Sequence, residues 1–288
     1  MAWLDSSLKM EPDAARDIAA TDRAFFHILQ LAGFTGGTEN PMKLGEMNWP
    51  DIRDLDKERL VAVYPIASFE QHGLHLPLLT DTIQLDAMVE SMDGKIGDRI
   101  VCLPTQWLGY SFHHMRFGGS LTARSQTHIR MLVETVDGLI GAGFDKVLVI
   151  NGHGGNSADL RVALQELKET HAETRVYGAS WWGVAAPALD SIREAGPNGS
   201  GHAGETETSM MLTLRPDLVQ TDRLHPDGGR PPSVYAGRVE HFRRIDEHSS
   251  RGNFGDPTVA TADKGQRMLD ATVNCLVEIV DDILGERL

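Results

Sequence analysis

Residues 60–66 read LVAVYPI, and residues 67–81, which follow directly, read ASFEQHGLHLPLLTD. The first run is apolar without a break, which predicts a buried strand. Glu70 and His72 stand two residues apart just beyond it, so extended backbone would point both side chains to one side. Asp81 follows a proline bend, close enough for the chain to fold back toward them. These ligand types suit a divalent transition metal such as zinc, manganese or iron, although the alternative is a polar loop whose charges are only solvated.

The composition limits the partners. The 288 residues carry 27 Lys and Arg against 41 Asp and Glu, a formal net charge of −14. This balance argues against nucleic acid or an anionic membrane and suits a neutral or cationic small molecule. Cys102 and Cys275 lie far apart and both stand in apolar runs, so we expect them to be reduced cysteines in the core. Since the chain shows neither a long apolar run nor a signal peptide, we expect a cytoplasmic protein with no membrane partner.

Beyond residue 41 the chain alternates apolar runs with segments of helical periodicity. Strands are predicted at 60–66, 100–103, 147–150 and 175–180, and helices at 86–98, 125–141, 158–170, 206–214 and 262–284. Solid apolar strands separated by helices predict an α/β fold of three layers, α/β/α, around a mostly parallel central sheet. In such sheets ligands bind at the carboxyl ends of the strands, which is where Glu70 and His72 fall.

Residues 1–41 form a predicted N-terminal helical extension ahead of a single domain at 42–288. Helical spacing over residues 13–31 places apolar side chains, including Phe25 and Phe26, on one side. This helix could pack on a neighbouring subunit or cover its own domain, and the sequence does not separate the two.

A second motif, NGHGGN at 151–156, follows the apolar run at 147–150. Its glycines permit a tight turn, and His153 sits at the tip of the strand-to-helix connection. A glycine-rich turn could cradle phosphate, but a histidine at its centre suits a metal better. A histidine that only hydrogen-bonds the turn is the structural alternative.

A third motif, GHAGETETS at 201–209, leads into a predicted helix and contains His202, Glu205 and Glu207. Acidic residues in a first helical turn are ordinary partners of the helix dipole, so one glutamate is expected to do only that. The other, with His202, could complete the site as a ligand and a proton-transfer group. Spacing alone does not say which glutamate has which role.

Together the three motifs resemble the creatininase-like amidohydrolase family, whose pattern is EQHGxHLP…TD, then NGHxxN, then HxGxxETS. Here they stand at residues 70–81, 151–156 and 202–209, in the same order. Shorter matches within 42–50, 109–121 and 255–265 extend the likeness to roughly residues 42–285.

The resemblance implies a hydrolase with two divalent ions per chain, zinc or manganese, with iron as a further option. The implied ligands are, for one ion, Glu70, Asp81 and His153 and, for the other, His72, Glu207 and the bridging Asp81. Glu207 and His202 are the implied catalytic residues, His202 as proton donor to the leaving nitrogen, whereas Glu205 is left as the dipole partner. Such ions activate a water near neutral pH and polarise a carbonyl.

The chain also departs from creatininase proper. That enzyme carries a Tyr-Glu pair where this chain has Gly154 and Gly155, and a tryptophan where it has Asn198, whereas Trp182 matches a tryptophan of its pocket. We therefore expect a roomier, more polar pocket and little turnover of creatinine. The substrate-binding residues expected are Ser111, His113, His114, Gly154 and Trp182.

The expected function is hydrolysis of a small cyclic or linear amide at its C–N bond. Two alternatives stay open: opening of a polyhydroxylated ring ketone derived from inositol, and binding of a small molecule without catalysis. All five ligand positions of the family motifs are present in this chain, which favours an enzyme over a binding protein. The resemblance further implies a homo-oligomer, hexameric by analogy, in which residues 1–40 contact a neighbour.

Overall fold

The computed structural model describes residues 43–196, 201–228, 239 and 241–288. The helix predicted over residues 13–31 and the predicted extension at 1–41 lie outside the described residues, so both stay predictions.

A four-stranded sheet forms the centre of this domain. Its strands are β1 (Val61–Ile66), β2 (Ile100–Cys102), β3 (Lys146–Asn151) and β4 (Arg175–Ser180), in the order β2-β1-β3-β4. Every neighbouring pair is parallel, and Ala62 pairs with both Val101 and Val147. Each strand lies within one residue of its predicted bounds, because an uninterrupted apolar run is a strong signal for a strand covered on both faces. The parallel α/β prediction is confirmed.

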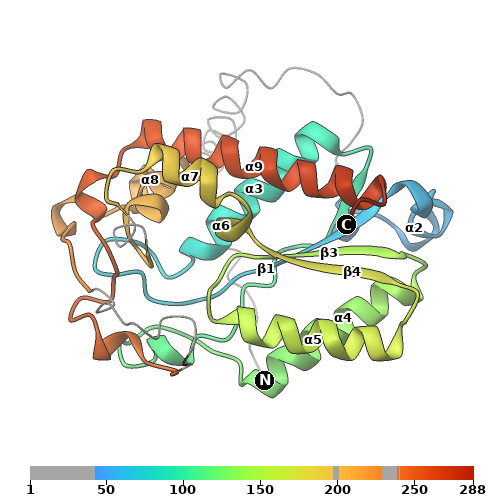
Figure 1. The fold of residues 1–288 in the computed structure, drawn as a ribbon, viewed down its shortest axis with the longest axis horizontal. Coiled ribbons are helices and arrows are strands. Elements are labelled where there is room, and N and C mark those ends of the chain that lie inside the picture. Colours follow the sequence, from blue (N-terminus) through green and yellow to red (C-terminus); the bar gives the residue numbers. More distant parts are fainter. Residues whose placement is uncertain (1–42, 197–200, 229–238, 240) are drawn as a thin grey trace, which may run out of the picture. The chain divides into compact units, whose positions relative to one another are not determined.

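Helices cover both faces of the sheet (Figure 1). One layer contains α3 (Thr80–Ile96), α6 (Trp181–Val184), α7 (Ala186–Ile192), α8 (Glu205–Leu214) and α9 (Ala262–Leu284), and the other contains α4 (Ser125–Gly141) and α5 (Asn156–Thr170). Side chains of β1 alternate between the two cores: Val61 and Val63 face the first layer, Ala62 and Tyr64 the second. This arrangement is the predicted three-layer fold.

The largest error of the sequence prediction lies at the start of α3, which begins at Thr80 and not at residue 86. Its first turn buries polar side chains, among them Asp81 and Gln84, so the apolar periodicity that marks a helix is missing there. Short elements were not predicted: α2 (Trp49–Asp54), α6, α7 and the 3-10 turns Leu44–Glu46, Lys57–Arg59, Phe112–His114, Pro216–Leu218, Thr221–Arg223, Ile245–Glu247 and Pro257–Val259.

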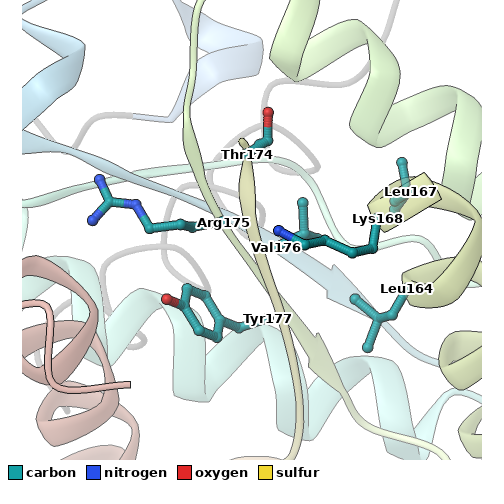
Figure 2. Close-up of a pocket in the computed structure, with 7 residues that line it drawn as sticks. All are labelled: Leu164, Leu167, Lys168, Thr174, Arg175, Val176 and Tyr177. Carbon is teal, nitrogen blue, oxygen red and sulfur yellow. The ribbon is translucent and has the colours of Figure 1, made fainter. Parts of the chain in front are cut away.

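A cavity of about 210 Å³ lies beside the edge strand β4, lined by residues of α5 and of the first half of the strand (Figure 2). Arg175 at this end of the strand pairs with Asp145 and Glu286. The cavity is therefore at the amino end of β4, away from the sheet edge where ligands of parallel sheets bind. Among the described residues, no helix combines the length and apolar character needed to cross a membrane.

Candidate metal centre

The predicted ligands gather at the carboxyl edge of the sheet. Glu70 and His72 follow β1, and His153 follows β3 in the tight turn before α5. Asp81 lies in the first turn of α3 and Glu207 in the first turn of α8. Four separate elements thus bring three carboxylates and two imidazoles to one place, because parallel strands end at the same edge.

Asp81 lies between two histidines and offers one oxygen to each. Its Oδ1 is 2.9 Å from Nε2 of His72, and its Oδ2 is 3.2 Å from Nδ1 of His153. The Ser68 hydroxyl donates to Oδ2 at 2.7 Å and fixes the orientation of the carboxylate. Glu207 approaches the same nitrogen of His72 at 3.8 Å. This two-sided contact is the arrangement that a bridging carboxylate requires.

Glu70 is fully buried, and neither of its carboxylate oxygens has an aligned hydrogen-bond donor among the described residues. Three ring nitrogens nevertheless crowd it: Nε2 of His114 at 3.1 Å, Nε2 of His153 at 3.1 Å and Nδ1 of His202 at 3.5 Å. A buried carboxylate without aligned donors is costly, and a divalent cation beside Glu70 would remove that cost.

Three groups among the described residues have their ligand atoms within 4.8 Å of one another: Glu70, His114 and His202; His72, His202 and Glu207; and Glu70, His72 and Asp81. His153 belongs to none of them, because its ring turns Nδ1 toward Asp81 and Nε2 toward Glu70. Its Nε2 also contacts the Tyr110 carbonyl at 3.0 Å, which can only accept, so Nδ1 is the nitrogen left for a metal.

Burial and mutual charge shift the pKa values of these groups in different directions. Burial alone would lower the pKa of His72, but the carboxylates of Asp81, Glu207 and Glu70 raise it to about 9. Burial raises the pKa of Glu207 to about 7, although nearby His72 opposes the shift. The pKa of Asp81 is lowered despite burial, chiefly by His72 and His153. Carboxylates that hold a proton on a buried neighbouring histidine create a negative potential that also attracts a divalent cation.

Glu205 does more than interact with the helix dipole, which corrects the sequence prediction. Its fully buried carboxylate lies 2.7 Å from Nζ of Lys264 and accepts hydrogen bonds from the backbone amides of Glu194 and Ala195. Burial opposes its charge, but Lys264 and these amides hold the pKa of Glu205 below its ordinary value. Glu205 therefore ties α8 to α9 and to the loop after α7.

The predicted substrate-binding residues occupy different positions. Ser111 places its Oγ 3.4 Å from Nε2 of His153, and the His113 ring stacks on that of His153 with centroids 5.5 Å apart. His114 is buried against Glu70, whereas Gly154 is exposed with open space around it. Trp182 packs against Trp181 and the core under α9. Asn198 lies outside the described residues.

Gly155 itself adds no room to the pocket. A Cβ at this position would collide with the Tyr110 carbonyl and with the rings of His153 and His113. The space beside Gly155 is therefore filled by the 110–113 segment, whereas Gly154 is exposed and a Cβ there would meet no other described residue.

Several residues of the site carried no sequence assignment. Asn151 accepts from the His153 amide at 3.0 Å and Asn156 accepts from the Tyr110 amide at 2.9 Å, so both hold the turn. Phe242, 59% exposed, lies 5.9 Å from the His113 ring and forms an aromatic cluster with Tyr110 and Phe112. The two asparagines stand in the second motif, whereas nothing local to Phe242 marks it.

The fold and the site define an α/β protein with a buried centre suited to divalent metal ions. Residues 45–280 match the Creatininase family, described as creatinine amidohydrolase, and the chain belongs to this family. Its relatives include a peptidase, an inosose hydrolase and a creatinine amidohydrolase, which are hydrolases of different substrates. The chain is therefore a creatininase-like hydrolase.

The mycofactocin precursor peptide peptidase of Mycobacterium ulcerans is 32% identical over 84% of this chain and 90% of its own length. The 3-dehydro-scyllo-inosose hydrolase of Thermotoga maritima is 26% identical over 83% and 82%. A solved structure of a mutant creatininase of zinc–zinc type superposes with a TM-score of 0.71 at 25% identity, covering 85% of this chain and 98% of the other.

Proposed function

We propose that this enzyme hydrolyses an amide C–N bond with the help of two divalent metal ions bridged by Asp81. The observation that carries the proposal is Glu70, whose two buried oxygens find no aligned donor in the part of the chain that the structure describes, while three ring nitrogens lie within 3.5 Å. A cation satisfies such a carboxylate better than a misaligned imidazole does.

Five side chains would hold the ions: Glu70, Asp81 and His153 at one position, and His72, Asp81 and Glu207 at the other. When bound, the ions lower the pKa of a water and polarise the substrate carbonyl. Zinc and manganese both suit this mixture of carboxylate and imidazole, and iron fits the same donors. The creatininase of zinc–zinc type, a relative by fold, supports two ions.

The protein's own groups orient the ligands and move the proton. Ser68 holds Asp81, and the Glu70 carbonyl accepts from Nδ1 of His72 at 3.1 Å, which leaves Nε2 facing Asp81. His202 lies beside Glu70, with its ring 4.2 Å from that of His72, and we assign to it the transfer of a proton to the leaving nitrogen.

A peptide or another decorated amide is the substrate class that we favour over creatinine. The peptidase of Mycobacterium ulcerans is a relative at 32% identity, and the opening at Gly154 together with the exposed rings of Phe112 and Phe242 leaves room for a large group. Ser111 and His113 line the side of His153. The inosose hydrolase of Thermotoga maritima supports a ring ketone as the second candidate.

We also propose a homo-oligomer in the cytoplasm, as the family resemblance implies. Light scattering on the full chain and on a chain beginning at Met42 tests the role of residues 1–40. An unchanged mass would exclude these residues from the assembly without excluding the oligomer.

The test of the function combines metal analysis with turnover. Protein reconstituted with zinc or manganese should bind two ions per chain and hydrolyse members of a panel of short peptides and N-substituted amides. His202→Ala should lower kcat at least 100-fold, about the contribution of one acid–base group. His171→Ala, at a surface histidine paired with Asp137, is the matched control and should leave turnover unchanged. Turnover of ring ketones alone, or creatinine turnover with kcat/KM at or above about 10⁴ M⁻¹s⁻¹, would reject this substrate class.

A further inference from the structure

We propose that Gln71 sets the proton positions on two histidines beside Glu70, so that His114 presents an N–H group and His202 a bare nitrogen to the same carboxylate oxygen. No motif assigned a role to Gln71. The catalytic consequence rests on the proposed function, but the proton positions themselves are independent of any substrate.

The orientation of the Gln71 amide is fixed by two backbone groups. Its Oε1 accepts from the Gly73 amide at 2.9 Å, and its Nε2 donates to the Gly252 carbonyl at 2.8 Å. A flipped amide would set donor against donor and acceptor against acceptor. Gly252 has φ +86, and any Cβ there would collide with the Gln71 side chain. The glycine thus allows the loop to close on this amide, which is only 6% exposed.

His114 receives the second amide hydrogen of Gln71. Its Nδ1 lies 2.8 Å from Nε2 of Gln71, which can only donate, so Nδ1 accepts. The proton of a neutral His114 ring therefore sits on Nε2, 3.1 Å from Oε1 of Glu70. To bind a metal through Nε2, the ring would have to move its proton to Nδ1, against the amide donor.

His202 is held in the opposite sense by the backbone of the same residue. Its Nε2 lies 2.7 Å from the Gln71 carbonyl oxygen, which can only accept, so the proton of the ring sits on Nε2. Nδ1 is then bare and lies 3.5 Å from Oε1 of Glu70. The amide nitrogen of Gln71 is also 3.2 Å from Nε2 of His202, but both of its hydrogens already have acceptors.

The two histidines therefore have unequal roles although they flank one oxygen. His202 can accept a proton at Nδ1 as the water oxygen bonds to the carbonyl carbon, and return it to the nitrogen as the C–N bond breaks. His114 stays a donor that faces Glu70. Gln71 is the positioning residue that maintains this difference.

Nitrogen-15 NMR of the imidazole rings tests the assignment directly, in metal-free and in zinc-loaded protein. Both rings should carry their proton on Nε2 in the metal-free protein, and His114 should keep it there with zinc bound. Gln71→Glu replaces the amide donor by an acceptor, so a proton should appear on Nδ1 of His114. His202 should not change, because the backbone carbonyl holds it. A wild-type His114 protonated on Nδ1 alone would overturn the proposal, whether or not the variant folds.

The positioning role is tested by zinc affinity and turnover of the same variant. Gln71→Glu should weaken zinc binding about 10-fold or more and lower kcat more than it raises KM. Gln106→Glu makes the same change at a partly buried amide that bonds Tyr64 and the Leu108 carbonyl, and should alter neither quantity more than twofold. If the His114 proton moves while zinc affinity and kcat stay at wild-type values, Gln71 has no positioning role. If zinc affinity falls but no amide is turned over even by the wild type, the proposed function fails and the proton assignment stands.

Discussion

Replacing Glu205 with Gln should cost far more stability than the loss of a helix-dipole partner. The substitution removes the charge that faces Lys264, whose side chain is itself buried. Removing one member of a buried ion pair costs about 3–5 kcal/mol. Lys264 keeps the Val259 carbonyl and Glu194, a largely exposed carboxylate, so we expect the lower end, about 3 kcal/mol.

Urea unfolding of wild type and variant at neutral pH measures this loss. Asp263→Asn is the matched control, because Asp263 is an exposed acid in the first turn of α9 and should cost only about 0.3–1 kcal/mol. Equal losses for the two variants would refute the ion-pair argument and restore the dipole account.

The stability difference between wild type and Glu205→Gln should also depend on pH, in a direction that the pKa of Glu205 determines. Burial alone would raise the pKa of Glu205, but Lys264 and two backbone amides lower it below 4.5. A depressed folded-state pKa contributes stability that is fully present above the unfolded value and is lost as pH falls through the folded value. The gap between wild type and Glu205→Gln should therefore be constant above about pH 5.5 and shrink below about pH 4.5.

Three further predictions concern the site. Asp81→Ala should lose both metal ions, whereas His153→Ala should chiefly disturb one; two ions retained at wild-type affinity after Asp81→Ala, measured by elemental analysis, would exclude the bridge. Glu207→Gln should abolish turnover and weaken one zinc site, while its unfolding free energy falls less than that of Glu205→Gln; the reverse ranking in paired kinetic and urea experiments would show that the roles of the two glutamates are exchanged. Gly155→Ala should lower the free energy of unfolding by about 1–3 kcal/mol, because its Cβ would collide with the Tyr110 carbonyl, and should also lower zinc affinity. Calorimetric unfolding and a zinc titration measure the two effects. Unchanged values would mean that the 110–113 segment moves aside easily.

The sequence predicted the sheet and most helices because their signals are local. The run at 60–66 and the periodicity of 125–141 contain their own information, and α4 and α9 have the predicted bounds. The start of α3 was missed because its buried residues Thr80, Asp81 and Gln84 are polar, so the apolar periodicity that marks a helix is absent there.

Contacts between distant segments limit how much of the site can be predicted from the sequence. The five expected ligands could be selected from motifs, but Glu205 and Lys264 are 59 residues apart, and neither segment signals the other. The filling of the space beside Gly155 by Tyr110 and His113 likewise depends on how two loops meet. Gln71 was visible in the first motif, yet its role depends on Gly252, which is 181 residues away.

The centre is divided between the first and last parts of the domain, and this has a consequence for biosynthesis. Glu70, His72 and Asp81 are synthesised well before His153 and Glu207, so a nascent chain carries three of the five proposed ligands before the last two are made. Ligands that meet only in the native state couple metal uptake to the end of folding. A chain still emerging from the ribosome would hold divalent ions weakly, and tight metal retention should appear only after α8 has docked on α3 and α9, as zinc release from arrested chains of increasing length would reveal.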